Sequence, residues 1–495
     1  MKHVVIVGGG VSGLAAAYFL RKLSAEAGVS VSCTLIEAAP DLGGKIVTHR
    51  RDGFVIDGGP DSFLAQKPWA AELCRELGVA DRLIGVNPAH RGVSVYHDGR
   101  LFSLPDGMLL GVPTKLWPFA RSPLISWLGK LRMALDLVVP ARQSDADESV
   151  GSFIRRRFGR EAVEKLAEPL MAGIHAADPD RLSLNATFPQ FAELERHHGS
   201  LIRGARAMAQ ARAHTATKPG SAFLTFPTGM REMVEALEAN LSSSIKLIKR
   251  RRVVFIARDD AAASDASEPI YEIRTDDGGR LTADAIILAT PAHVSSHLVD
   301  TLDPILSAGL ARIHHVSTAT VSLGFRRSDL GDGLVGTGFV VPRGEKCAIT
   351  AGTWSSNKFN GRAPADHVLV RAFLGGARDE SAAESDDETL VQLARAEVRN
   401  VLGVTAPPVV AEVFRWWKAI PQYDVGHLDR VAALDARCGH GLFLTGNAYH
   451  GVRIPDCVHL AKQVSEKVVR FLVGPEADAR AILDSVEEAV SIGNT

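Results

Sequence analysis

The chain has 495 residues, 46% hydrophobic and 23% charged, a balance typical of soluble globular proteins, and its length corresponds to about three domains. Lys and Arg total 56 against 57 Asp and Glu, so the net charge of −1 argues against a general nucleic-acid binder. The five cysteines include no Cys-x-x-Cys pair, which favours reduced thiols in the cytoplasm over a disulfide framework.

Residues 4–37 follow the order strand, glycine-rich turn, helix and second strand. The uncharged stretch 4–20 is interrupted by three glycines and is shorter than a membrane span, so we expect it to lie in the core. Its turn matches Gly-x-Gly-x-x-Gly, and Glu37 ends the second strand, where a carboxylate accepts ribose hydroxyls. The pattern predicts a dinucleotide site, with pyrophosphate at the helix N-terminus. The turn residues are Gly8, Gly9, Gly10, Val11, Ser12 and Gly13.

The C-terminal part of the chain repeats this organisation. Residues 281–290 predict one buried strand, and residues 441–445 predict another, followed by Gly446. A helix is expected over 458–472, with Pro455 in its first turn. Both ends of the chain therefore supply strand-then-helix units. We expect one doubly wound α/β domain assembled from separated segments, with the middle of the chain inserted into it.

Three polar or mixed segments complete the organisation. Residues 144–149 read as a loop, and 259–267 as the turn of a hairpin. Residues 115–140 combine tryptophans and leucines with Lys and Arg in a helical pattern. Such a region either rests on a membrane surface or packs its apolar side in a core with solvated charges, and we favour the core.

Further segments, in chain order, carry a resemblance to a known family. They are Leu42 to Lys45, Gly58 to Phe63, Gly111 to Lys115, Glu168 to Leu170, Ala172 to Ala176, Leu182–Ser183, Thr187 to Pro189, Ser200 to Ile202, Thr353 to Lys358, Pro421 to Tyr423, Gly426–His427 and Ile454 to Cys457. With the fingerprint, they resemble the amine-oxidase-like flavoprotein superfamily and, within it, the porphyrinogen oxidases of haem synthesis. Segments 111–115 and 353–358 look most like the Gram-positive-type enzymes that use coproporphyrinogen III.

The resemblance implies three domains. A discontinuous Rossmann-like FAD-binding domain would comprise 1–85, 220–292 and 428–495. Residues 86–219 would form a mainly helical domain, and 293–427 an inserted α+β substrate-binding domain. The activity implied is a six-electron oxidation of coproporphyrinogen III or protoporphyrinogen IX to the porphyrin, with O2 as acceptor, in the cytoplasm or at the inner face of the membrane. Another flavin amine oxidase or desaturase and a non-catalytic binding protein are the alternatives.

The resemblance also assigns residues. The propionates of such a substrate need cationic partners, for which Lys67 is the first candidate and Lys358, Arg91 and Arg453 are weaker ones. For each of them, a plain solvated surface charge is the simpler interpretation. Gly173 and His175 are the catalytic candidates, although His175 reads more simply as a pocket-lining ring at an aromatic position. No metal site is expected, because the pairs 197–198 and 314–315 lack helical i, i+4 spacing. Besides the fingerprint and Glu37, FAD is expected to contact Ala38, Gly44, Lys45, Gly59, Pro60, Asp61, Ser62, Val253, Trp416, Gly446, Val452, Arg453 and Ile454.

Two residues depart from the family pattern. Arg453 occupies a position that is usually small, so its side chain points away from the flavin or reaches over it toward substrate. Ala177 replaces a usual glycine. We expect the first departure to alter the flavin site and the second to be minor.

Overall fold

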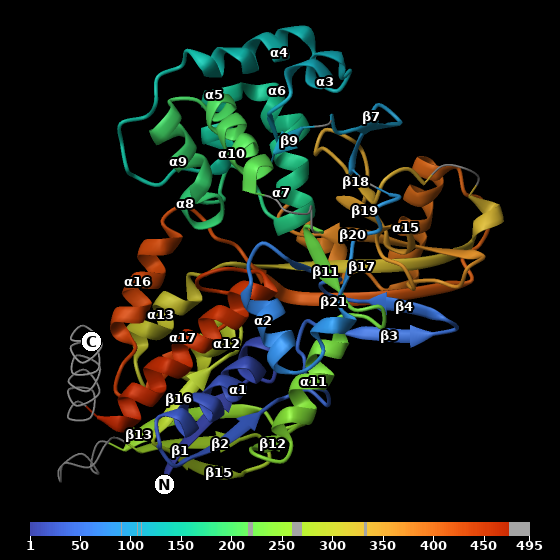
Figure 1. Ribbon diagram of the computed structural model, residues 1–495. Helices are drawn as coiled ribbons and strands as arrows, with labels where there is room; N and C mark the ends of the chain where they lie inside the picture. The colour runs from blue at the N-terminus through green and yellow to red at the C-terminus, as the bar shows by residue number, and fades with distance from the viewer. Residues whose placement is uncertain are drawn as a thin grey trace, which may run out of the picture.

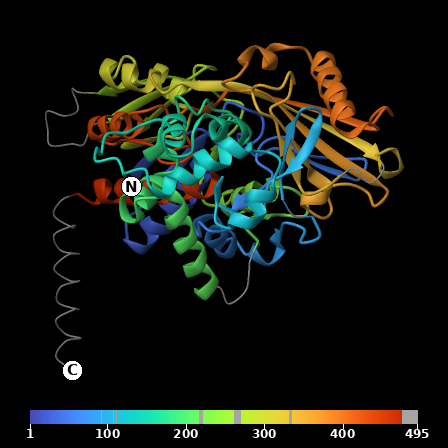
Figure 2. The ribbon, with the colours of Figure 1, turned by 90° about the horizontal axis from the view of Figure 1, so that it is seen from above.

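The computed structural model describes residues 1–90, 92–105, 107–109, 111–215, 221–259, 270–330 and 334–474. A parallel sheet with its helices lies at one end of the molecule, and a group of helices, α3 to α10, lies at the other (Figure 1). A seven-stranded sheet stands beside the helical group, as the view from above shows (Figure 2).

The parallel sheet is assembled from segments that are far apart in the sequence. Its order is β12 (Lys246–Ile248), β2 (Val31–Ile36), β1 (Lys2–Val7), β16 (Ala285–Leu288) and β22 (Leu442–Leu444), and all its pairs are parallel. The four residues of β16 are fully buried, as expected for an apolar strand covered on both faces. The predicted doubly wound α/β fold is confirmed.

The two ends of the chain meet on this sheet. Helix α1 (Val11–Glu26) packs against α17 (Ile454–Val473), and Ser465 Oγ donates to the carbonyl of Ala16 at 3.0 Å. Helix α17 begins four residues before its predicted start, with Pro455 in its first turn as expected. This pairing brings the N-termini of both helices to the same cavity.

The single strand predicted over 281–290 is wrong. The structure has two strands there, β15 (Arg280–Ala283) and β16, which belong to different sheets. Asp284 lies between them and fixes the point where the chain passes from one sheet to the other. Its N–H donates to the carbonyl of His3 in β1 at 2.8 Å, and its carboxylate accepts from the His3 N–H at 2.7 Å. Strand β15 pairs with β14 (Ile270–Thr275), which pairs with β13 (Val253–Asp259). The predicted hairpin is thus confirmed; its turn, apart from Asp259, falls outside the described residues.

The seven-stranded sheet forms the centre of the molecule. Its order is β21 (Val410–Pro421), β17 (His315–Arg326), β20 (His367–Gly375), β19 (Ala351–Trp354), β18 (Gly338–Val340), β7 (Ser94–His97) and β8 (Arg100–Ser103). The last two strands come from the segment expected to be mainly helical. Their Asp98-Gly99 turn has positive φ at both residues, 48° and 71°, which explains the hairpin. The domain boundaries themselves remain a prediction.

The helical group is held by a buried ionic cluster. The Asp136 carboxylate accepts from Arg157 Nε at 2.5 Å, from Ser200 Oγ at 2.5 Å and from the Ile202 N–H at 3.0 Å. Asp136 and Arg157 are both fully buried. The cluster joins the segment after α4 to helices α5 and α10. The predicted loop at 144–149 is confirmed, and Ser149 caps α5.

The expectation of core packing for residues 115–140 is partly wrong. Phe119, Leu124 and Ile125 are buried as expected. Trp127 and Leu128, however, are 70% and 81% exposed, so this part of α4, which lies at the outer edge of the helical group (Figure 1), is not packed in a core. Among the described residues, no helix has the length and apolar content to cross a membrane.

The other regular elements are β3 (Thr48–Arg51), β4 (Phe54–Asp57), β5 (Phe63–Leu64), α2 (Trp69–Glu76), β6 (Ile84–Gly85), β9 (Met108–Leu109), β10 (Val112–Pro113), α3 (Leu116–Arg121), α4 (Trp127–Ala134), α5 (Val150–Phe158), α6 (Arg160–Ala162), α7 (Glu168–His175), α8 (Leu184–Thr187), α9 (Pro189–His198), α10 (Leu201–Thr215), β11 (Phe223–Thr225), α11 (Arg231–Leu241), α12 (Ala292–Leu298), α13 (Pro304–Ala311), α14 (Ser355–Lys358), α15 (Asp387–Leu402) and α16 (His427–Arg437).

Candidate functional site

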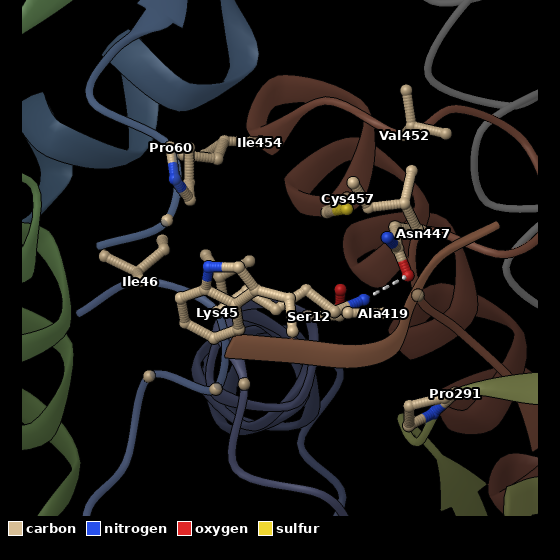
Figure 3. Close-up of a pocket in the computed structure, with 18 of the residues that line it drawn as sticks. Ser12, Lys45, Ile46, Pro60, Pro291, Ala419, Asn447, Val452, Ile454 and Cys457 are labelled. Carbon is tan, nitrogen blue, oxygen red and sulfur yellow. Dashed lines mark hydrogen bonds between the residues drawn. The ribbon is translucent and has the colours of Figure 1, made fainter. Parts of the chain in front are cut away.

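One cavity of about 630 Å³ runs from the end of the parallel sheet to the seven-stranded sheet and the last turn of α7. Segments from both ends of the chain face each other across it (Figure 3). Of the predicted cofactor residues, all but Gly9, Gly13 and Asp61 line this cavity. The separated motifs of the sequence therefore converge on one site.

The fingerprint glycines are required by the backbone. Gly8 has φ +107°, and a Cβ on Gly13 would lie 1.9 Å from the Gly8 carbonyl oxygen. Because Gly13 sits in the first turn of α1, this contact lets the helix start directly against the strand. No side chain caps α1, so the N–H groups of its first turn are free to bind an anion.

Glu37 is fixed beside the fingerprint. Its carboxylate accepts from the Gly9 N–H at 2.6 Å and from the Ala39 N–H at 2.7 Å. Arg251, Arg252 and Val253 line the cavity at this end too. A carboxylate held here still has lone pairs for a ribose diol, as predicted.

The glycine-rich loop 58–62 is anchored at one carbonyl oxygen. The Gly58 oxygen accepts from Thr320 Oγ1 at 3.0 Å, Arg371 Nη2 at 2.6 Å and Trp416 Nε1 at 3.1 Å. A Cβ on Gly59 would lie 1.8 Å from the Lys45 carbonyl oxygen. The loop is thus fixed on one side against Lys45, which follows the Gly43-Gly44 pair, and on the other side against the seven-stranded sheet. The same contact orients the Trp416 indole at the cavity wall.

Asp61 supports this loop from outside the cavity. Lys358 Nζ lies 2.9 Å from both carboxylate oxygens of Asp61. Burial of Asp61 opposes its ionisation, but Lys358 and Arg371 outweigh burial and hold the pKa of this carboxyl well below its usual range. Asp61 is therefore ionised and ion-paired at neutral pH, and its role is to position Gly59, Pro60 and Ser62.

The C-terminal segment closes the other side of the cavity. Val452, Arg453 and Ile454 line it where α17 begins, and no side chain caps that helix. Tyr423 fixes the preceding loop: its hydroxyl donates to the Asn447 carbonyl at 2.8 Å and accepts from the Gly451 N–H at 2.9 Å. The positive end of the α17 dipole therefore faces the cavity, as predicted.

The last turn of α7 forms the inner wall. Ala172, Gly173, His175 and Ala176 line the cavity there, as do Phe373 of β20 and Thr350, the residue before β19. Ala176 has a left-handed conformation, φ +49°, which is strained for a residue with a Cβ. Both predicted catalytic candidates, Gly173 and His175, are thus brought to the site.

The four predicted propionate partners differ in position. Arg453 lines the cavity, and no described residue pairs with its guanidinium. Lys67 is ion-paired with Asp456 in the first turn of α17, and Lys358 is paired with Asp61; neither lines the cavity. Arg91 falls outside the described residues.

The charges of the cavity favour an anionic ligand. Five cationic side chains line it, and Glu37 is the one carboxylate among the described lining residues. Asp277 neutralises one of these cations, Arg251, at 2.6 Å. The remaining four cations would be balanced by a pyrophosphate bound between the two helix N-termini and by ligand carboxylates at the inner end of the cavity. The other four cations are Lys45, Arg252, Arg371 and Arg453.

Lys45 gives the site a pH dependence. Its ammonium donates to Asn447 Oδ1 at 3.2 Å (Figure 3), and burial lowers its pKa to about 8. A bound anion favours the charged form, so affinity for FAD is expected to fall as pH rises through about 8. Flavin fluorescence titrations of the apoprotein at pH 7 and 9 check this. Lys45→Met should bind FAD more weakly with little dependence on pH; an equal pH effect in both proteins would contradict the assignment.

Fold and site together define a dinucleotide-binding protein, with the glycine-rich turns and two uncapped helix starts at one end of the cavity and the last turn of α7 at the other. The chain matches the flavin containing amine oxidoreductases over residues 11–469, and it belongs to this family. The predicted FAD is therefore its cofactor, and the residues present fit that cofactor: glycines where a Cβ would clash, two uncapped helix starts and an anchored Glu37.

Named relatives narrow the likeness. The chain is 38% identical to coproporphyrinogen III oxidase of Bacillus subtilis, covering 95% of this chain and 98% of that protein. It is 30% identical to the chloroplastic protoporphyrinogen oxidase of Nicotiana tabacum, and the match covers 94% of this chain and 85% of that protein. A crystal structure of a provisionally assigned protoporphyrinogen oxidase from Exiguobacterium sp. 255-15 has a TM-score of 0.82 at 34% identity and covers 94% of this chain and 98% of that one.

Several residues of the site were missed by sequence reasoning. Arg371, Thr318 and Thr320 line the cavity from strands β20 and β17, and no local motif marks them. Asn447, which lines the cavity, lies two residues after the predicted strand at 441–445 and was not among the predicted site residues. A polar residue directly after a buried strand was the available signal.

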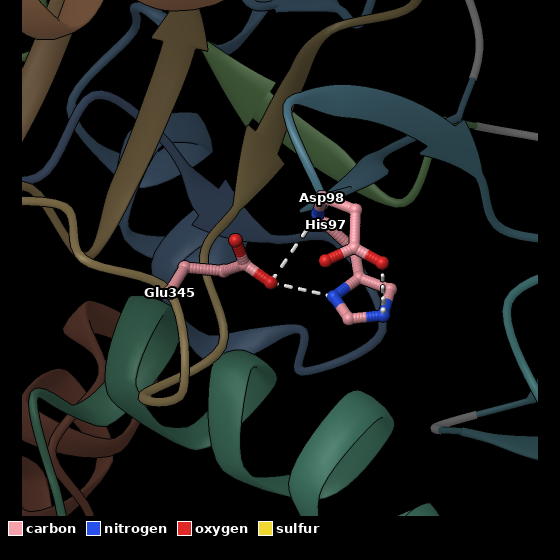
Figure 4. Close-up of side chains that lie close together, drawn as sticks. All are labelled: His97, Asp98 and Glu345. Carbon is pink, nitrogen blue, oxygen red and sulfur yellow. Dashed lines mark hydrogen bonds and ion pairs between the residues drawn. The ribbon is translucent and has the colours of Figure 1, made fainter.

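A group of side chains outside the cavity has the composition of a metal site. His97, Asp98 and Glu345 gather at the β7–β8 turn (Figure 4). Glu345 Oε1 lies 2.5 Å from His97 Nδ1, and Asp98 Oδ2 lies 3.5 Å from Nε2. The shorter contact leaves no room for a cation between its two atoms, so the group is best described as an imidazole held between two carboxylates.

Proposed function

We propose that the chain catalyses the FAD-dependent oxidation of coproporphyrinogen III to coproporphyrin III, with protoporphyrinogen IX as a second candidate substrate and O2 as the acceptor. The main observation in support is that one cavity extends from the glycine-rich dinucleotide cradle to an inner chamber beside the last turn of α7. The unpaired guanidinium of Arg453 lines this cavity. The likeness to the coproporphyrinogen III oxidase of Bacillus subtilis and the protoporphyrinogen oxidase of Nicotiana tabacum supports this substrate class.

When bound, FAD would accept the electrons removed from the bridging carbons and pass them to O2, giving hydrogen peroxide. The chain's own residues orient the reactants. The start of α17 directs its positive dipole end into the cavity, where it would stabilise negative charge on a bound cofactor. Trp416 and the anchored 58–62 loop fix the wall of the chamber. Gly173 lets α7 pack closely against strands β18 and β19, since a Cβ there would lie 3.1 Å from Val340 Cγ1 and 3.5 Å from Ala351 Cβ.

Arg453 is the proposed partner of a substrate propionate. It lies at the N-cap of α17, and burial lowers the pKa of its guanidinium, a cost that a bound carboxylate would offset. Lys67 remains a second candidate, because its partner Asp456 lies three residues beyond Arg453. A propionate at this end of the cavity meets Arg453 directly, whereas Lys67 must first separate from Asp456 to reach it.

An anaerobic half-reaction tests the function. The flavin-loaded protein should lose its absorbance near roughly 450 nm when mixed with coproporphyrinogen III. Arg453→Met should slow this bleaching by about tenfold or more, since a charged hydrogen bond contributes about 1.5–3 kcal/mol. Arg121→Met, which removes a cation outside the cavity, is the matched control. If the flavin keeps its absorbance with both coproporphyrinogen III and protoporphyrinogen IX, the proposed function is wrong.

We further propose that this cytoplasmic enzyme touches an anionic membrane surface through its α3–α4 patch, defined as Trp117, Trp127, Leu128, Leu131 and their basic neighbours. Trp117 and Trp127 are 67% and 70% exposed. Arg121 lies 4.5 Å from the Trp117 ring and Lys130 lies 4.3 Å from the Trp127 ring. Exposed aromatics beside cations are suited to a lipid headgroup layer.

Vesicle flotation tests this contact. The protein should float with phosphatidylglycerol vesicles and not with phosphatidylcholine vesicles. A Trp127→Ser, Leu128→Ser double variant should bind at least about tenfold more weakly, because it loses two apolar anchors. Trp417→Ser, at a tryptophan 55% exposed on β21, is the control. Undiminished flotation of the double variant would contradict the contact.

A further inference from the structure

His175 is a buried imidazole in the cavity wall without a hydrogen-bond partner. It is the last residue of α7 and is 6% exposed. Its Nε2 is buried and unpartnered, and no described residue bonds to Nδ1 either. A buried polar group without a partner is unfavourable, and because Nε2 is closed off from the cavity, Nδ1 is the ring nitrogen to which a bound ligand can supply a partner.

The ring is held in place by its surroundings. Gln422 Nε2 donates to the His175 carbonyl at 3.5 Å, and the Phe188 ring packs edge-on, with centroids 5.7 Å apart at 81°. The next residue, Ala176, is fixed in its left-handed conformation by a bond from its N–H to the Ala172 carbonyl at 3.1 Å. His175 therefore lines the cavity from a rigid helix end; Nε2 is closed off by protein, and Nδ1 is the ring nitrogen that is neither buried nor bonded.

The charged group that faces His175 is Arg453, across the cavity wall. Burial, with a smaller effect from Arg453, lowers the pKa of His175 to about 3. The imidazole is therefore neutral at physiological pH and has one ring nitrogen able to take up a proton.

We propose that His175 is the proton acceptor of the oxidation, an inference that rests on the proposed function. In each two-electron step, a C–H bond at a bridging carbon breaks and its electron pair leaves with the hydrogen to the cofactor. An adjoining pyrrole N–H bond breaks, its electrons stay in the ring system as a new double bond, and the proton moves to the imidazole. The imidazolium then loses this proton to solvent, assisted by repulsion from Arg453.

Arg453, Lys45 and Glu37, which also line the cavity, are unsuited to this step. Arg453 is a guanidinium and does not give up its proton in proteins. Lys45 is protonated at neutral pH and bonded to Asn447. Glu37 lies at the opposite end, where it accepts two backbone N–H bonds. A phenyl ring would fill the space of His175 without leaving polar atoms unpaired, so the imidazole suits a chemical role better than a packing role.

The test compares wild type with His175→Phe and His175→Gln, all loaded with FAD. Flavin content and the binding of coproporphyrin III, followed by porphyrin fluorescence, should stay within about threefold of wild type. Anaerobic flavin bleaching by coproporphyrinogen III should slow by about 100-fold or more in both variants, the range of a lost proton acceptor. The wild-type rate should be level between about pH 6 and 8, whereas the variant rates should rise with pH as hydroxide replaces the imidazole.

The outcomes separate this inference from the function itself. Wild-type flavin that does not bleach would remove the proposed function. Bleaching by wild type together with variant rates within about threefold and level in pH would overturn the role of His175. If His175→Phe fails to hold flavin, His175→Gln decides, because it keeps a polar side chain but cannot take up the proton.

Discussion

Gly59→Ala is expected to yield protein with less than about a tenth of the wild-type flavin content. A Cβ at this position would lie 1.8 Å from the Lys45 carbonyl oxygen and 3.6 Å from Trp416 Cζ2. The nearer atom belongs to the backbone, so the added methyl group must displace the loop carrying Gly59 and Pro60, both of which line the cavity. The ratio of absorbance near roughly 450 nm to that at 280 nm in the purified protein measures the loss.

Gly439→Ala is the matched control for this change. Its added Cβ meets no atom within 4 Å, and its backbone, like that of Gly59, is not in the left-handed region. The two variants therefore add the same methyl group, one against backbone and one into open space. A Gly59→Ala protein that keeps a full complement of flavin would show that the loop is not part of the cradle.

The cofactor cradle could be predicted because its functions are encoded in consecutive residues. The turn at Gly8 to Gly13 is determined by its own glycines, as the positive φ of Gly8 shows. Pro455 likewise marks the start of the helix that faces the cavity. The sequence did not reveal that three donors from different strands meet at the Gly58 oxygen, since Thr320, Arg371 and Trp416 come together only in the folded sheet.

Side-chain partners were equally hidden from the sequence. Lys67 and Lys358 resemble free cations in the sequence, but Asp456 and Asp61 pair with them in the fold. Leu128 belongs to an apolar pattern, but periodicity alone does not say which helix face is covered. His175 had a simple aromatic interpretation until the structure left its ring nitrogens unpaired. Contacts between distant segments decided each of these cases.

Arg157→Met is expected to destabilise the helical group by about 3–5 kcal/mol, because it leaves the Asp136 carboxylate buried without its cation. The change also deprives the Val139 and Gly199 carbonyls of donors at 3.0 and 2.8 Å. A chain of several domains does not unfold in one step, so hydrogen exchange of α5 and α10 is a better measure than a single melting temperature. Both helices should lose protection before the parallel sheet does.

Two further variants distinguish a lost ion pair from a lost side chain. Arg160→Met removes the same side chain from the exposed Arg160–Glu164 pair, in which Arg160 is 83% exposed, and should change exchange very little. Adding Asp136→Asn to Arg157→Met removes the stranded charge and should recover part of the protection, since an uncharged amide costs less to bury than a carboxylate. If the double variant is no more protected than Arg157→Met alone, packing by Arg157, rather than its charge, holds these helices together.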